Sequence, residues 1–305
     1  MHGIETKSDL NREGSNRKMK QKSFRFRNWE CAYLDSETPG PVLVFCHANG
    51  YSAGCYNYYF PLLSKHYRVI APDFLGHGRS EFSLKFHNWN VFRDQILALL
   101  DHESIEKTNI IGHSLGGASS LLAAAKEPSR FEKVLAMDPV ILGWKLILLS
   151  KFLENPLARG AKKRRTHFKS IELVRRSFRK FPAFANFEPS IFEDYLNSCF
   201  TNTGHEQEVK LCCDPKVEAR IFGHAHFHVF KNFYGIKTEN HIAIPENFEV
   251  CSPKYANLLA KVHPKSDVTI FPGFTHFFPF ERPKETWDWM QRCLGIKEGR
   301  LELVR

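Results

Sequence analysis

A short apolar run that breaks into Gly-x-Ser-x-Gly limits what this chain can fold into more than any other feature of its sequence. Residues 108–113 (TNIIGH) have the composition of a buried strand, and residues 118–126 (ASSLLAAAK) have that of a helix. Between them lies Ser114, with one glycine two positions before it and another two positions after it. A Cβ at either glycine would collide with the adjacent strand or helix, so the pattern predicts a strand, a sharp turn and a helix. We expect the turn to expose the Ser114 hydroxyl.

Apolar runs and helical patterns alternate along much of the chain. Residues 23–35 alternate apolar and polar side chains, which predicts one or two half-exposed strands. Continuous apolar runs predict buried strands, and apolar spacings of three and four residues predict helices. The predicted buried strands cover residues 41–46, 68–74, 108–113, 133–137, 233–238 and 267–271, and the predicted helices cover residues 51–67, 89–102, 118–126, 255–262 and 283–294. This alternation indicates an α/β fold with a mostly parallel sheet flanked by helices.

The alternation stops between residues 140 and 230. Helical patterns at 144–153, 170–181 and 189–198 follow one another there without a convincing buried strand. A chain of 305 residues is long enough for a large core and one inserted layer. We therefore expect a flexible N-terminal tail at residues 1–22, a core formed by residues 23–139 and 231–305, and an inserted helical cap at residues 140–230.

The positive charge of the chain is concentrated in one segment. The formal net charge is +10, and residues 159–180 alone contain ten Lys or Arg and one Glu. A solvated helix face is the commoner explanation for such a cluster. A contact of residues 159–180 with nucleic acid or an anionic membrane is the alternative.

Cysteine usage and the opening segment bear on where the protein works. The eight cysteines are scattered, and residues 1–22 lack the apolar stretch of a secretory signal. No window approaches the length of uninterrupted apolar sequence that a membrane span needs. These features predict a cytoplasmic protein with reduced thiols.

A catalytic role for Ser114 requires further residues. A serine hydroxyl is a poor nucleophile at neutral pH, so it needs a histidine within hydrogen-bond reach and an acid that orients the histidine. His276 lies between the last predicted strand and the last predicted helix, which makes it the candidate base.

Four separated motifs occur in the order typical of one fold family. They are residues 47–50 (HANG), residues 73–80 (DFLGHGRS), residues 112–117 (GHSLGG), and the His276 loop followed by residues 281–283 (ERP). With these motifs the chain resembles the α/β-hydrolase fold family over roughly residues 24–294. The resemblance implies cleavage of an ester, amide, thioester or carbon–carbon bond beneath a helical cap. It implies no cofactor.

The resemblance also implies a set of site residues. Ser114 would be the nucleophile and His276 the base, and the backbone N–H groups of Asn49 and Leu115 would form the oxyanion hole. Most relatives place the acid after the strand that follows the cap, where this chain has Glu239 but no aspartate. Some members place it after the strand that follows the nucleophile helix, where this chain has Asp138. We take Asp138 as the acid and Glu239 as the alternative.

Three histidines at alternate positions, His224, His226 and His228, invite comparison with a metal site. No carboxylate or cysteine partner accompanies them, so we expect no metal.

The sequence therefore predicts a serine hydrolase, specifically a carboxylic ester hydrolase, that forms an acyl-enzyme and acts on a small, apolar acyl substrate. A catalytically silent binding protein and a carbon–carbon bond hydrolase are the alternatives.

Overall fold

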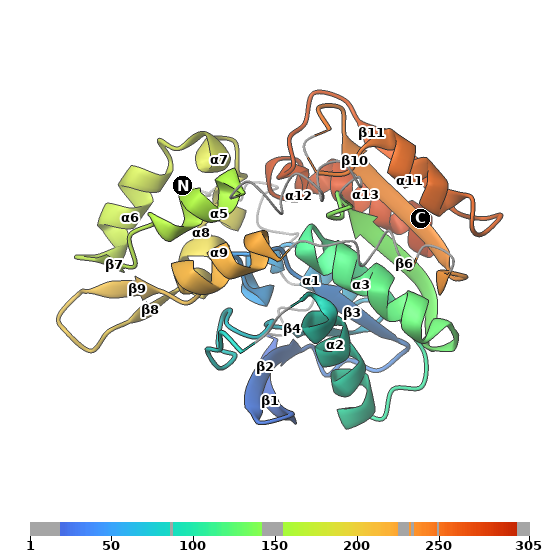
Figure 1. Cartoon of the computed structure of the whole chain (residues 1–305), viewed down its shortest axis with the longest axis horizontal. Helices are drawn as coiled ribbons and strands as arrows, with labels where there is room; N and C mark the ends of the chain where they lie inside the picture. The colour runs from blue at the N-terminus through green and yellow to red at the C-terminus, as the bar shows by residue number, and fades with distance from the viewer. Residues whose placement is uncertain are drawn as a thin grey trace, which may run out of the picture.

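Eight strands form the central sheet of the protein (Figure 1). The computed structural model describes residues 19–85, 88–141, 155–224, 232, 235–248 and 250–297. The strands lie in the order β1-β2-β4-β3-β5-β6-β10-β11. Their bounds are Lys20–Phe26 (β1), Trp29–Asp35 (β2), Val42–Cys46 (β3), Arg68–Pro72 (β4), Thr108–His113 (β5), Phe131–Met137 (β6), Glu239–Pro245 (β10) and Asp267–Phe271 (β11).

Strand direction follows the burial pattern that the sequence indicates. The half-exposed strand β1 pairs antiparallel with β2, and β2 pairs antiparallel with β4. The remaining neighbours, from β4 to β11, are parallel. Every residue of β5 is buried, as expected for a strand that helices cover on both faces. The carboxyl ends of the parallel strands therefore meet at one edge of the sheet.

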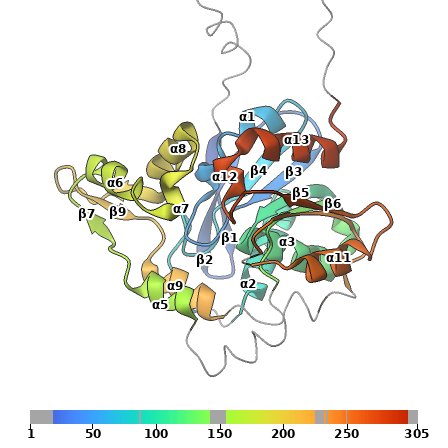
Figure 2. The ribbon, with the colours of Figure 1, turned by 90° about the horizontal axis from the view of Figure 1, so that it is seen from above.

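Helices cover both faces of this sheet (Figure 2). Residues of α2, α3 and α11 pack into the apolar cluster on one face, and residues of α1, α12 and α13 pack into the cluster on the other. The bounds are Phe60–Leu63 (α1), Asn90–His102 (α2), Leu115–Lys126 (α3), Pro253–Ala260 (α11), Phe278–Glu281 (α12) and Pro283–Leu294 (α13), with short 3-10 turns at Ala53–Tyr56 (η1) and Pro128–Arg130 (η2). The predicted α/β architecture is confirmed.

The segment between β6 and β10 forms a separate layer beside the carboxyl ends of the strands (Figure 1). Its helices are Pro156–Lys162 (α5), Ile171–Phe178 (α6), Pro182–Ala185 (α7), Pro189–Cys199 (α8) and Pro215–Gly223 (α9). It also contains a three-stranded antiparallel sheet of His167–Phe168 (β7), Val209–Leu211 (β9) and Phe200–Asn202 (β8). We call residues 155–223 the cap. The sequence predicts α6 and α8 but not α5, α7, α9 or this sheet. Strands of two or three residues leave no periodic pattern.

Three further expectations differ from the structure or lie outside it. The tail was expected to extend to residue 22, but β1 begins at Lys20. The strand expected at residues 233–238 begins at Glu239 instead. The helix expected at 144–153 and two of the three alternate histidines, His226 and His228, lie outside the described residues.

Two properties of the described residues concern the environment of the protein. None of the helices in the described ranges has the length and apolar character that a bilayer span requires. All eight cysteines are free thiols, and seven of them are buried.

Candidate active site

The turn after β5 has the strained geometry that its glycines predict. Ser114 has φ 56° and ψ −113°, a conformation that side-chain-bearing residues rarely adopt. A Cβ at Gly112 would collide with the backbone of Gly116, and a Cβ at Gly116 would collide with that of Cys46. The Ser114 amide donates to the Met137 carbonyl at 2.9 Å, which ties the turn to the end of β6. Ser114 thus lies at the start of α3, at the carboxyl edge of the sheet.

Asp138 and His276 meet at the same edge. Asp138 follows β6, His276 follows β11, and His276 Nδ1 lies 2.6 Å from Asp138 Oδ2. The Asp138 side chain is fully buried, and its other oxygen accepts a hydrogen bond from the Cys251 amide at 3.2 Å. Its backbone amide donates to the Ala243 carbonyl at 2.7 Å. With Nδ1–H donating to this fixed carboxylate, the imidazole Nε2 keeps its lone pair for a proton.

His113, the residue before the serine, supports the His276 loop. Its Nε2 lies 2.9 Å from the His276 carbonyl oxygen, its Nδ1 lies 2.8 Å from the Tyr56 hydroxyl, and the rings of His113 and His276 lie 4.9 Å apart. Burial lowers the pKa of His113 well below its usual value, so this ring is neutral and donates from Nε2. The sequence does not reveal this role of His113, because the second position of a Gly-x-Ser-x-Gly motif carries no signal of what its side chain contacts.

The loop after β3 leaves the Asn49 backbone amide without an acceptor among the described residues. The Ala48 amide donates to the Tyr56 hydroxyl at 3.2 Å, and the Gly50 amide donates to His77 Nε2 at 3.1 Å. The Asn49 amide between them has no hydrogen-bond acceptor among the described residues. Leu115 is the first residue of α3, and the first amides of a helix have no acceptor inside it. The two predicted oxyanion donors are therefore available for an anion.

Buried polar groups fix the shape of this loop. His47 Nδ1 donates to the Ala48 carbonyl at 2.7 Å, and its Nε2 accepts from the Phe74 amide at 2.8 Å. Burial lowers the pKa of His47 well below its usual value and that of His77 to about 4. Asp73 accepts from the amides of Ala53 and Arg79 at 2.8 and 3.0 Å. Two of the motifs identified in the sequence thus build a rigid support for Asn49.

The cap contacts this loop directly. The Asn49 side-chain amide donates to the Glu218 carbonyl at 3.2 Å, so it is held against α9. The Glu218 carboxylate accepts from Arg164 at 2.6 Å. The ring of Tyr51 lies 5.6 Å from that of Tyr195 in α8. The cap and the loop after β3 therefore hold each other in place.

Glu239, the alternative acid, lies elsewhere. It is the first residue of β10 and therefore lies at the amino edge of the parallel strands, opposite Asp138. Its carboxylate contacts Lys133 Nζ and His241 Nε2, each at 3.1 Å. The structure does not bring Glu239 to His276. The sequence predicts a strand that ends at residue 238 and a turn at Glu239, but β10 begins at Glu239.

One group of possible metal ligands occurs among the described residues. A nitrogen of His241, an oxygen of Asp267 and the sulfur of Cys293 all lie within 4.8 Å of one another. This group is also at the amino edge, away from Ser114. Both ring nitrogens of His241 already face carboxylates, those of Asp267 and Glu239.

The basic segment 159–180 is partly used inside the cap. Arg175 contacts Glu193 at 2.7 Å, Arg179 donates to the Phe187 carbonyl at 2.8 Å, and Arg164 binds Glu218. The guanidinium of Arg179 also lies 4.2 Å from the centre of the Phe192 ring. Part of the charge that the sequence concentrates here therefore holds α5, α6, α8 and α9 together.

Comparison with known proteins places this arrangement in a family. Residues 41–189 match the family described as alpha/beta hydrolase fold, a range that includes the loop after β3 and the Ser114 turn. The crystal structure of E-2-(acetamidomethylene)succinate hydrolase superposes with a TM-score of 0.78 at 18% identity, covering 91% of this chain and 100% of that one. The chain has the α/β-hydrolase fold. The match supports the family that the four motifs indicate.

Curated relatives of this α/β hydrolase are similar over shorter segments. The dihydrolipoyllysine-residue acetyltransferase component of the acetoin cleaving system of Pseudomonas putida is 40% identical over 104 residues, 34% of this chain and 28% of that protein. The 2-hydroxy-6-oxo-6-phenylhexa-2,4-dienoate hydrolase of Burkholderia cepacia is 29% identical over 116 residues, 36% of this chain and 41% of that protein. The matched segments thus span less than half the length of either relative.

Proposed function

We propose that this protein is a serine hydrolase that cleaves an ester or a related acyl bond through an acyl-enzyme. The observation that carries the proposal is the 2.6 Å contact between His276 Nδ1 and Asp138 Oδ2, beside the strained turn that holds Ser114. A histidine that acts as base for a serine nucleophile needs a buried carboxylate that fixes the tautomer of its imidazole.

In the proposed mechanism, Ser114 Oγ attacks the substrate carbonyl carbon while its proton moves to His276 Nε2. Asp138 stabilises the imidazolium that forms. The bond between the carbonyl carbon and the leaving group then breaks while His276 donates the proton to that group. An acyl group remains on Ser114. Water, activated by His276, releases the acid and restores the serine.

The negative charge on the substrate oxygen would be stabilised by the amides of Asn49 and Leu115. Both donors are fixed before substrate binds, one by the hydrogen-bonded loop after β3 and the other by α3. Each such donor contributes roughly 3 to 4 kcal/mol of transition-state stabilisation.

We further propose an apolar acyl substrate. Aromatic rings connect His276 with the cap. The ring centre of Phe277 lies 5.3 Å from that of His276, and the ring centre of Phe187 in the cap lies 5.8 Å from that of Phe277. The ring centre of Tyr51 lies 6.0 Å from that of Phe277. Such rings favour an apolar group over a charged one. The free thiols favour a reducing, cytoplasmic location.

Carbon–carbon bond hydrolysis is the second candidate. The matched relative from Burkholderia cepacia is named as a dienoate hydrolase. Both reactions use the same oxyanion donors and the same base, so substrate assays must separate them. Turnover of a 2-hydroxy-6-oxo-dienoate with none of a p-nitrophenyl acyl ester would favour this second candidate.

Labelling with a fluorophosphonate probe tests the proposed nucleophile. We expect the probe to label wild-type protein covalently, and we expect Ser114→Ala to remain unlabelled in mass spectrometry. Ser119→Ala is the matched control, because Ser119 is a buried serine of α3 that should not react. An unlabelled wild-type protein, or equal labelling of Ser114→Ala, would show that the protein is not a serine hydrolase and would favour a silent binding protein.

A further inference from the structure

Two buried cysteines meet where the cap packs on the core. Cys55 lies in η1, shortly after the loop that contains Asn49, and Cys199 is the last residue of α8 in the cap. Their sulfur atoms lie 3.3 Å apart. No other pair of thiols in the described ranges is in hydrogen-bond contact.

Hydroxyl groups surround this pair of sulfur atoms. The Ser198 hydroxyl lies 3.4 Å from the Cys55 sulfur, and the Ser52 hydroxyl lies 3.8 Å from Cys55 and 3.6 Å from Cys199. Burial raises the pKa of Cys55, but hydrogen bonding with Cys199, Ser198 and Ser52 outweighs it and lowers the pKa below its usual value. Burial and the neighbouring Cys55 raise the pKa of Cys199. The surroundings therefore favour Cys55 as the first thiol to ionise and react.

Other buried thiols have different surroundings. Burial raises the pKa of Cys31, Cys46 and Cys293 to about 12 in each case. None of these three has a second thiol in contact within the described residues. They match the unreactive thiols of an apolar core.

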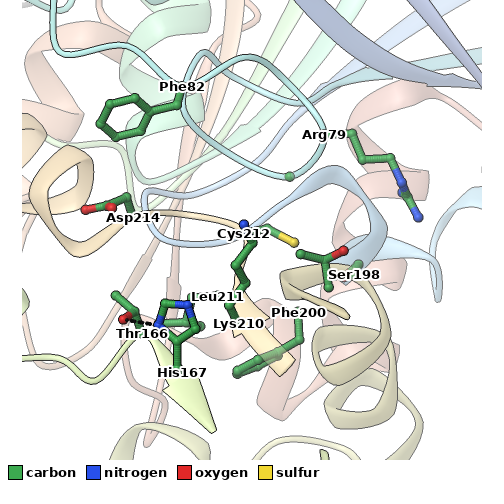
Figure 3. Close-up of a pocket in the computed structure, with 12 residues that line it drawn as sticks. Arg79, Phe82, Thr166, His167, Ser198, Phe200, Lys210, Leu211, Cys212 and Asp214 are labelled. Atoms are coloured by element: carbon green, nitrogen blue, oxygen red, sulfur yellow. Dashed lines mark hydrogen bonds between the residues drawn. The ribbon is translucent and has the colours of Figure 1, made fainter. Parts of the chain in front are cut away.

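A surface cavity lies one side chain away from this pair: Ser198 lines it, whereas Cys55 and Cys199 do not. It has a volume of about 550 Å³ and lies between the loop at residues 78–82 and the cap sheet. Figure 3 shows Ser198 and Cys212 on its wall. The Ser198 hydroxyl contacts the Cys55 sulfur, so this one side chain links the cavity wall to the thiols.

We propose that Cys55 and Cys199 form a reversible disulfide, which joins the core to the cap, when the protein meets hydrogen peroxide. The contact between the two sulfur atoms and the cavity beside them are the observations that lead to this site.

The reaction balances in two steps. The Cys55 thiolate attacks one peroxide oxygen, the O–O bond breaks, and the departing hydroxide takes up the thiol proton, which yields a sulfenic acid and water. The Cys199 sulfur then attacks the Cys55 sulfur, the S–O bond breaks, and hydroxide leaves with the second thiol proton as water. Two thiols are oxidised to one disulfide, and one peroxide is reduced to two waters.

The disulfide would connect positions that are 144 residues apart in the chain. Closing so long a loop restricts the unfolded chain, so the oxidised protein should unfold at a higher temperature. We expect a rise in Tm of roughly 5 °C.

The test treats folded wild-type protein with hydrogen peroxide, blocks remaining thiols with N-ethylmaleimide, and digests the protein without a reductant. Mass spectrometry should find the Cys55 peptide joined to the Cys199 peptide, two hydrogen atoms lighter than their sum. Dithiothreitol should separate them and reverse the change in Tm. Cys55→Ser and Cys199→Ser should lose the product, whereas Cys212→Ser, which alters a thiol on the same cavity, should retain it.

Two results would overturn the proposal. One is wild-type protein whose Cys55 and Cys199 remain reduced, or are oxidised only separately, while circular dichroism shows the native fold. The other is a different disulfide partner for either residue. The wild-type arm with dithiothreitol decides the question even where a serine variant does not fold.

Discussion

The two edges of the parallel sheet each hold a histidine beside a carboxylate, and the difference between the two sites explains why we assign catalysis to one edge. At the carboxyl edge, His276 has one carboxylate partner, the fully buried Asp138. At the amino edge, His241 has two, since its Nδ1 lies 2.8 Å from Asp267 and its Nε2 lies 3.1 Å from Glu239. A base needs one nitrogen fixed and the other free. His276 meets that requirement and His241 does not.

The surroundings of the two histidines differ in the same sense. The His276 loop lies beside the strained Ser114 turn and two unused backbone amides, whereas Lys133 neutralises the carboxylate beside His241. The amino edge is therefore an ion-pair network that joins β6, β10 and β11. Whether a histidine beside a carboxylate can act as a base therefore depends on the groups around the ring nitrogen that does not contact that carboxylate.

Replacing each of the two histidines with alanine should give the largest difference in kcat between the two edges. His276→Ala should lower kcat on an activated ester by about 10⁶-fold, because neither the serine proton nor the leaving group would have a partner. His241→Ala should leave kcat within about twofold of wild type, since its effects are confined to stability. Initial rates on p-nitrophenyl butyrate, with the fold checked by circular dichroism, measure both. A loss of activity in His241→Ala alone would reverse our assignment of the two edges.

The two acids give the next contrast. Asp138→Asn should lower kcat by roughly 10³ to 10⁴-fold, because the amide no longer fixes the tautomer or stabilises the imidazolium. Glu239→Gln is the matched control and should remain near wild type in the same assay. If Glu239→Gln is the inactive variant and Asp138→Asn is unaffected, Asp138 is not the acid.

The smallest effect concerns the stability of the amino edge. Burial raises the pKa of Glu239, but hydrogen bonds from Lys133 and His241 outweigh it and lower the pKa below its usual value. A lowered pKa means that the ionised carboxylate stabilises the fold above the unfolded-state pKa and that this contribution is lost as the pH falls through the folded-state pKa. Glu239→Gln should therefore be less stable than wild type at pH 7, by up to about 1 kcal/mol, and this difference should shrink toward pH 3. Urea unfolding at both pH values measures it, and a difference that grows on acidification would contradict the assignment.

The sequence predicts most of the fold and the candidate site because local patterns carry them. The Ser114 turn needs its glycines, and the strands β5 and β11 lie where apolar runs place them. Asp138 and His276 follow predicted strands, so parallel strand order is enough to bring them to one edge.

Local sequence patterns do not predict the start of β10. Its first residues, Glu239, Asn240 and His241, are polar, yet the structure places them within a buried strand. Three of their side chains make contacts elsewhere in the fold: the Asn240 side-chain amide donates to the Leu259 carbonyl, His241 contacts Asp267, and Glu239 contacts Lys133. Hydrophobic periodicity cannot reveal a strand whose polar groups are paired across the fold. Because the predicted strand ends at residue 238, the sequence places Glu239 in the turn after it and so makes Glu239 a candidate acid.

The hydrogen bond between Asp138 and His276 also sets the order in which a working site can arise during synthesis. The two residues are 138 positions apart, and Asp138 is held in addition by Ala243 and Cys251. On the ribosome, the segment with Ser114 emerges long before any of these partners. A nascent chain therefore carries the serine without its base, and the chemistry we propose can begin only when translation has passed residue 276.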